Sequence, residues 1–217
     1  MAATNPVQPD VLADIEARTP VSLHPVLEAA FKYRKQLIAA VCVILVVTVA
    51  YAGFKAYNSS AAATAQEQLG DIMVSSTGAD RLAKLEAMLG GVPSSVLPAV
   101  TLEAAQTAMT VGDYAKAEGY WNDLIGMTDG EMRFVARLGK AKAMTLAGHG
   151  ADALKEMKGL AQEATEAYTV PVYRQLALAA EAAGDKAEAL AAYKKLDAEN
   201  IGDKPFIEYK ISQLENE

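Results

Sequence analysis

The clearest pattern in this chain is a repeat of small and apolar residues at a spacing of 36. Within each copy, apolar residues recur three and four positions apart, which is the spacing of one helix face. In the third copy, two such helical segments, 173–183 and 186–196, are separated by Gly184 and Asp185. Glycine readily ends a helix and lets the chain reverse. The pattern therefore predicts helical hairpins that repeat along the chain.

Four columns of residues agree in all three copies. They are Gly112, Gly148 and Gly184; Ala105, Ala141 and Ala177; Ala117, Ala153 and Ala189; and Leu124, Leu160 and Leu196. Four positions after the second alanine of each copy stands a bulky residue: Trp121, Met157 or Tyr193. The order small, small, large resembles the tetratricopeptide repeat, whose usual unit has about 34 residues. The resemblance implies an all-α solenoid with a concave surface that binds another chain.

A second pattern is an apolar run of 18 residues at 37–54, which contains no charged residue. About 20 helical residues cross the bilayer core, so a run of this length predicts one transmembrane helix. The alternative is a core helix of a soluble protein. The many β-branched residues of the run argue against that alternative, because such runs are uncommon in soluble helices.

The basic residues around the apolar run predict its orientation. The 20 positions before the run hold Arg18, Lys32, Arg34 and Lys35, whereas the 20 positions after it hold only Lys55. The positive-inside rule therefore places the N-terminus in the cytoplasm and the repeats outside it. The alternative is a cleaved signal peptide with its cleavage site near 63–65. Since 36 residues with four prolines precede the run, we expect an uncleaved signal anchor.

Charge and chemistry narrow the function further. Residues 59–217 carry 15 Lys and Arg against 23 Asp and Glu, a net charge of −8, which repels nucleic acid. The only cysteine, Cys42, lies inside the apolar run, so an intramolecular disulfide is excluded. His24 and His149 are far apart, and no Cys, His or carboxylate cluster has the spacing of metal ligands. Glycine-rich phosphate-binding motifs are also missing from the sequence. We therefore expect a binding protein, not an enzyme, with no catalytic, metal or cofactor site.

These patterns divide the chain into five segments. We expect a cytoplasmic, largely disordered segment at 1–24 and a signal-anchor transmembrane helix with its flanks at 25–58. A stalk and a degenerate helical hairpin are expected at 59–97, followed by three 36-residue repeats at 98–204. The last segment, 205–217, is predicted to be a capping helix. The residues expected to cover the last hairpin are Phe206, Tyr209, Ile211 and Leu214.

The first helix of each repeat forms the concave wall of a tetratricopeptide solenoid. By register, the candidate protein-binding residues on this wall are Gln106, Met109, Lys142, Arg174, Leu178 and Glu181. Such a mixture suits an extended or partly unfolded segment of another protein. It does not match the basic carboxylate clamp of chaperone-binding tetratricopeptide domains, because Leu102 and Leu138 occupy positions that the clamp needs to be basic. These two leucines either line the groove or pack against neighbouring helices.

The chain combines one predicted span, a small-residue stalk at 59–63, a degenerate hairpin and three repeats. The pattern of the first repeat is clearest from residues 102–106 to Ala117. Over residues 25–214 the chain resembles YfgM-type proteins, the ancillary subunits of the bacterial SecYEG translocon. This resemblance implies a single-pass inner-membrane protein with a periplasmic C-terminal domain. It also implies an adaptor whose partners are translocon subunits, periplasmic chaperones or exported chains. A scaffold of another inner-membrane complex, or a homo-oligomer, stays open as the alternative.

Overall fold

The computed structural model describes residues 33–216, and the chain divides into two units, Met1–Asn58 and Ser59–Glu217. Over the described residues the regular elements are α-helices and one short 3-10 helix, without any strand. The all-α class expected from the sequence is therefore confirmed. The segment expected to be disordered, 1–24, and the start of the segment 25–58 lie outside the described residues.

Helix α3 (Arg34–Ser75) contains the apolar run. The apolar side chains of the run at 38–54 are exposed; Val46 and Val49, for example, are 67% and 70% exposed. A helix that is apolar all round needs an apolar surrounding. Among the described helices, α3 is the one that is long and apolar enough to cross a membrane. The small-residue stalk at 59–63 is helical, as part of α3.

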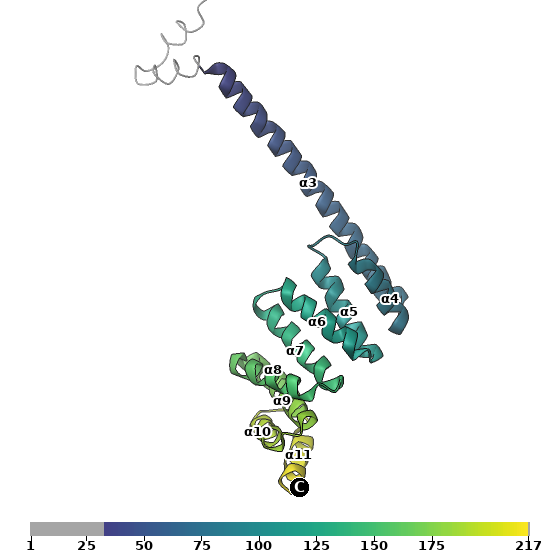
Figure 1. The fold of residues 1–217 in the computed structure, drawn as a ribbon, viewed down its shortest axis with the longest axis vertical. Helices are drawn as coiled ribbons and strands as arrows, with labels where there is room; N and C mark the ends of the chain where they lie inside the picture. The colour runs from purple at the N-terminus through teal and green to yellow at the C-terminus, as the bar shows by residue number, and fades with distance from the viewer. Residues whose placement is uncertain (1–32, 217) are drawn as a thin grey trace, which may run out of the picture. The chain divides into compact units, whose positions relative to one another are not determined.

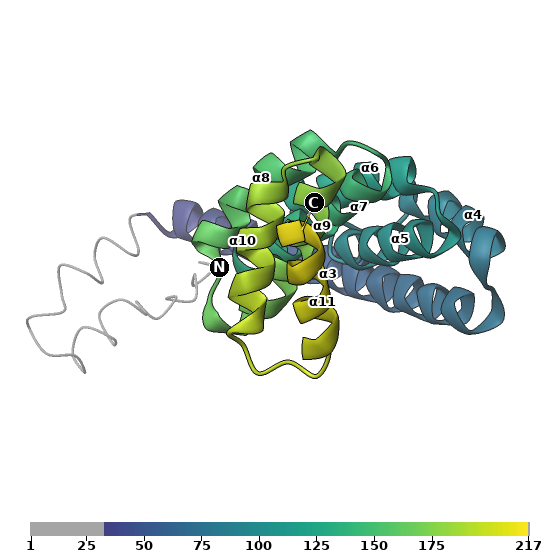
Figure 2. The same ribbon diagram turned by 90° about the horizontal axis from the view of Figure 1, so that it is seen from below.

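The second unit is a stack of antiparallel helices in which each helix packs against the next (Figure 1). The helices after α3 are α4 (Gly78–Leu89), α5 (Leu97–Val111), α6 (Tyr114–Met127), α7 (Gly130–Leu146), α8 (Gly150–Glu163), η2 (Glu166–Tyr168), α9 (Thr169–Ala183), α10 (Lys186–Asp197) and α11 (Lys204–Asn216). Figure 2 shows α6, α8 and α10 along one side of the stack, with α5, α7 and α9 on the other. Helix α7 also contacts α9. The first helices of the hairpins therefore form the inner side.

The glycine column lies in the turn after the first helix of each repeat. Gly112, Gly148 and Gly184 have φ angles of 83°, 88° and 75°, in the left-handed region that residues with a Cβ rarely adopt. The residue after the glycine is the N-cap of the second helix. Asp113 and Asp185 each accept a hydrogen bond from the backbone N–H three positions on, at 3.1 Å. The sequence spacing of 36 is thus the spacing of these turns.

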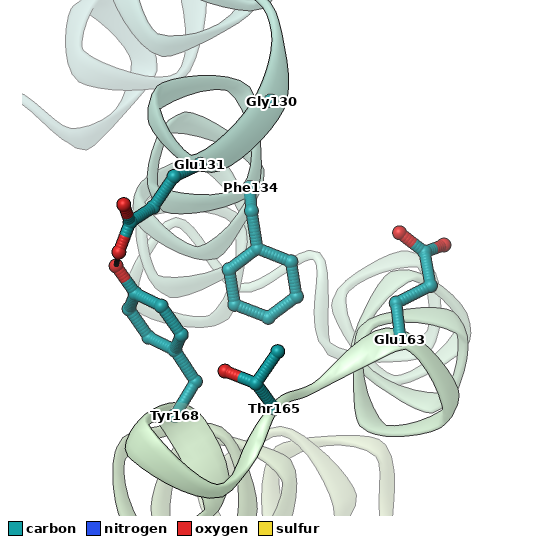
Figure 3. A pocket seen from close by; sticks show the side chains of 6 residues that line it. All are labelled: Gly130, Glu131, Phe134, Glu163, Thr165 and Tyr168. Atoms are coloured by element: carbon teal, nitrogen blue, oxygen red, sulfur yellow. Dashed lines mark hydrogen bonds between the residues drawn. The ribbon is translucent and has the colours of Figure 1, made fainter.

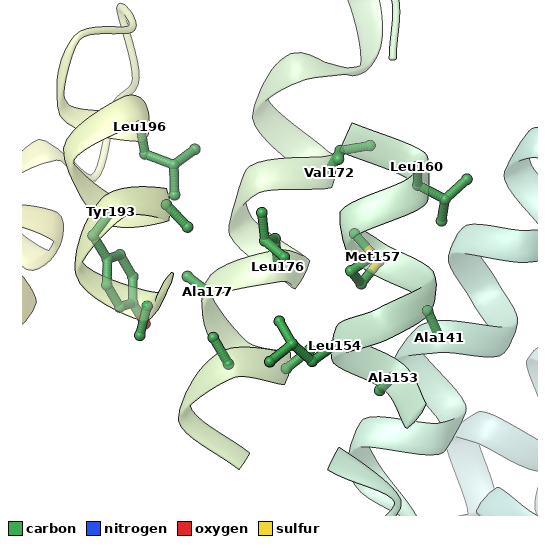
Figure 4. Packing of buried hydrophobic residues seen from close by; sticks show 14 of the residues in the cluster. Ala141, Ala153, Leu154, Met157, Leu160, Val172, Leu176, Ala177, Tyr193 and Leu196 are labelled. Carbon is green, nitrogen blue, oxygen red and sulfur yellow. The ribbon is translucent and has the colours of Figure 1, made fainter. Parts of the chain in front are cut away.

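The alanine and leucine columns form the core. All six alanines of the two columns are fully buried, and the three leucines are at most 1% exposed. Small side chains let neighbouring helices approach closely, and the bulky column fills the space between hairpins. Figure 4 shows this arrangement for Met157 and Tyr193, which lie on either side of Leu176 of α9.

The packing of the last helix differs from the sequence prediction. Ile207 is the fully buried residue of α11, and Ile211 and Leu214 pack partly buried against the same core. The prediction was wrong for Phe206 and Tyr209, which are 51% and 63% exposed. Ile207, Ile211 and Leu214 are spaced four and three apart and share one helix face, whereas the two aromatic residues project from other faces.

Candidate functional site

A groove of about 410 Å³ lies on the inner side of the helix stack. Its lining residues come from one second helix, α6, and two first helices, α7 and α9. They are Trp121, Val135, Leu138, Gly139, Lys142, Pro171, Arg174, Gln175 and Leu178. The lining is mostly apolar, with a few polar groups, which is the usual character of a binding groove.

Trp121 provides the indole surface of the groove. It projects from α6 and is 7% exposed. A Cβ placed on Gly139 of α7 would lie only 2.6 Å from two atoms of this ring. Glycine at 139 therefore lets the indole pack flat against the backbone of α7. The Nε1 donor of Trp121 is buried without a hydrogen-bond partner in the described part of the chain.

Two leucines form the apolar walls. Leu178 of α9 is 42% exposed, although its neighbours Ala177 and Ala179 are fully buried. Leu138 of α7 is half-buried and lines the groove while it also packs against the main core. It therefore combines the two roles that the sequence left open. A partner side chain that covered Leu178 would remove apolar surface from water, which is favourable.

The two basic residues of the groove differ in their partners. Arg174 donates two hydrogen bonds to the carboxylate of Asp203, one of them from Nη2 to Oδ1 at 2.9 Å. This pairing lowers the pKa of Asp203 and raises the pKa of Arg174. Lys142 is exposed and has no ion-pair or hydrogen-bond partner among residues 33–216. Lys142 is therefore the basic group of the groove that is available to a partner.

Comparison with known families agrees with this architecture. The sequence profile of the tetratricopeptide repeat-like domain family matches residues 31–216. The chain belongs to this family. No curated protein and no solved structure matches the chain. Repeat domains of this kind present extended concave surfaces that bind other proteins, so the match supports an interaction module.

In this tetratricopeptide repeat-like domain, three of the six binding residues predicted from the repeat register lie together. Lys142, Arg174 and Leu178 line the groove. Gln106 and Met109 lie on α5 and are not part of its lining. Glu181 lies near the end of α9, where Lys210 of α11 approaches its Oε1 to 2.5 Å. The negative charge of Glu181 is therefore compensated by Lys210 of the terminal helix, which is not part of the three repeats.

The sequence prediction missed the groove residues that do not occupy the chosen positions on the first helix of each repeat. Trp121 belongs to a second helix, and Pro171 and Gln175 lie at positions that the three-residue register did not select. One signal was present in the sequence. Gly139 lies inside a predicted helix, where glycine is unfavourable relative to alanine by about 1 kcal/mol. Gly119 has a similar position in α6 without any close contact, so this signal alone does not single out Gly139.

Proposed function

We propose that this protein is a membrane-anchored adaptor whose groove binds an extended segment of another protein. The groove beside Trp121 carries this proposal, because it combines an apolar lining with the unpaired Lys142. The segment that fits would place an apolar side chain against Leu178 and an acidic group near Lys142. The remaining surface of residues 59–217 carries an excess of acidic residues, so an acidic segment is attracted here and repelled elsewhere.

The location that we propose is the bacterial inner membrane, with the N-terminus in the cytoplasm and the repeats in the periplasm. The length and composition of α3 support the span. The basic residues before the apolar run support this orientation. Protease added to spheroplasts would then digest residues 59–217. Protection of that segment would contradict the orientation, and a mature chain beginning near Ala65 would indicate a cleaved signal peptide.

The partners that we propose are subunits of the SecYEG translocon, periplasmic chaperones and exported chains. The resemblance of the layout to YfgM-type proteins supports this assignment. The alternative is a scaffold or self-assembling subunit of another membrane complex. The exposed Phe206 and Tyr209 on the terminal helix favour that alternative, because exposed aromatic side chains at the end of a stack suit contact with a second copy.

Photo-crosslinking in gently solubilised membranes tests the groove. A crosslinking amino acid at Pro171, which lines the groove and is exposed, should capture partner chains that mass spectrometry can identify. Replacing Leu178 by Ser and Lys142 by Glu should lower this capture roughly tenfold, since a buried leucine contributes about 1.5–3 kcal/mol. The matched control is Lys155→Glu, which makes the same charge change at an exposed position of α8.

The identity of the captured chains separates the two functions. Translocon subunits, chaperones or exported proteins support the adaptor, whereas a ladder of products with the chain itself supports the scaffold. Equal capture by the double variant and by the unchanged protein would mean that partners bind elsewhere.

A further inference from the structure

A second cavity, of about 420 Å³, lies at the junction of α7, α8 and η2. Its lining consists of Gly130, Glu131, Phe134, Glu163, Thr165 and Tyr168. Figure 3 shows Phe134 in the middle, Glu131 and Tyr168 on one side, and Glu163 on the other. None of these residues lines the groove beside Trp121.

The residues of this cavity are not part of the repeat pattern. The positions 36 away from Phe134 are Pro98 and Val170, and those 36 away from Tyr168 are Met132 and Lys204. The connection from α8 to α9 also differs, because it contains η2, whereas only two residues connect α6 to α7. Both rings pack partly buried against the main core, but the corresponding positions of the other copies carry no aromatic residue.

Two aromatic rings form one wall of the cavity. The ring centroids of Phe134 and Tyr168 are 4.9 Å apart, and the ring planes are inclined by 51°. The hydroxyl of Tyr168 donates a hydrogen bond of 2.6 Å to Oε1 of Glu131. This bond orients the tyrosine ring and raises the pKa of its hydroxyl. The faces of aromatic rings carry partial negative charge, which attracts cations within about 6 Å.

Carboxylates flank this wall on both sides. Oε2 of Glu131 has no hydrogen-bond partner among residues 33–216, and Glu163 accepts a hydrogen bond from Nη1 of Arg137 at 2.6 Å. Arg137 also donates to Glu156, so one guanidinium compensates two carboxylates. Glu163 is the last residue of α8, where the helix dipole adds further negative charge. Glu166 in η2 is acidic as well, so the charges around the cavity leave a negative potential.

We propose that this cavity binds the cationic side chain of an arginine or lysine from a partner polypeptide. The ammonium or guanidinium group lies between Glu131 and Glu163, and its methylene chain packs against Phe134 and Tyr168. Anionic groups are repelled from this position. A metal ion is not favoured, since the described residues contain no group of three metal-ligating side chains. This site is independent of the groove, so either can be correct without the other.

Nuclear magnetic resonance of the full chain in lipid nanodiscs tests the proposal. The methyl group of Thr165 lies in the cavity and serves as the reporter. Titration with N-acetyl-arginine methylamide should shift this signal to saturation. The citrulline derivative has nearly the same shape without the charge, and it should bind roughly tenfold more weakly. Added salt should weaken the arginine derivative and leave the citrulline derivative unchanged.

Variants locate the site within the cavity. Glu131→Gln combined with Glu163→Gln should weaken the arginine derivative about fivefold to tenfold while the fold is retained, because both side chains are exposed. Asp152→Asn combined with Glu208→Gln is the matched control, since it also removes two exposed carboxylates, neither of which lines the cavity. Equal binding of the arginine and citrulline derivatives would overturn the proposal. So would full binding by the double variant, or no saturable shift of Thr165 with either compound.

Discussion

Replacement of Gly139 by alanine tests the contact that forms the indole surface of the groove. Gly139 lies inside α7, and an added Cβ would lie 2.6 Å from two ring atoms of Trp121 and 2.8 Å from a third. Ordinary contacts begin at 3.4 Å, so the ring or the helix must move by about 0.8 Å, the difference between the two distances. The ring is 7% exposed and rigid, so it cannot move without displacing its neighbours.

The size of the effect follows from two opposing contributions. Alanine inside a helix is favoured over glycine by about 1 kcal/mol. Overpacking of a buried contact costs about 1–3 kcal/mol. Gly119 in α6 provides the control, because it also lies inside a helix but has no atom within 4 Å of an added Cβ. Gly119→Ala should therefore be stabilising, and Gly139→Ala should be less stable than Gly119→Ala by about 1–3 kcal/mol.

Urea unfolding of residues 59–217 measures both variants. Trp121 is the only tryptophan of the chain, so its fluorescence reports the same contact directly. We expect Gly139→Ala to lower the urea midpoint and to shift the emission to longer wavelength, because the displaced ring gains contact with water. Gly119→Ala should raise the midpoint without a shift. If both variants are equally stable and have identical emission, the close packing of Trp121 on α7 is refuted.

Two further predictions concern polar contacts in the helix stack. Asp185→Ala should lower the free energy of unfolding by about 1 kcal/mol because it removes a helix cap. His149→Ala should have a smaller effect because His149 makes no capping bond. The urea midpoints of the two variants measure this difference in stability. The second prediction concerns acid. The pairing of Arg174 lowers the pKa of Asp203 below its usual value of 3.8, so this pair stabilises the folded state above about pH 4 and its contribution is lost as the pH falls further. Asp203→Asn should therefore be less stable than the unchanged chain at pH 6, and the difference should shrink as the pH falls below 3.8. A difference that stays constant as the pH is lowered would contradict this reasoning.

The fold was predictable because the repeat places strict demands on a few positions. Gly112, Gly148 and Gly184 adopt a backbone conformation that is open to glycine and strained for most other residues. The alanine columns are fully buried where helices cross, and larger side chains would not fit there. These demands repeat with the geometry, so they are visible in one sequence. The apolar run at 37–54 is visible for a similar reason, because its length and purity are unusual.

The groove was only partly predictable because its composition depends on contacts beyond the repeat. The register selected Arg174 and Glu181 as binding residues, but both are paired with residues near or on α11, namely Asp203 and Lys210. A pattern of period 36 contains no information about that helix. The register also left out Trp121, because its contact with Gly139 of the next hairpin is visible only in the structure.

Buried and exposed columns of the repeat differ in what constrains them. The buried column of Ala105, Ala141 and Ala177 is identical in all three copies, whereas the next position carries Gln106, Lys142 or Leu178, all of them exposed. Stability of a solenoid comes from each repeat and its contact with the neighbouring repeats. An exposed inner position can therefore change without loss of that contact. Both cavities include side chains that do not repeat: Lys142 and Leu178, beside Trp121 of the bulky column, in one, and Phe134 and Tyr168 in the other. Departures from the repeat, and not the repeat itself, therefore indicate where this chain would distinguish one partner from another.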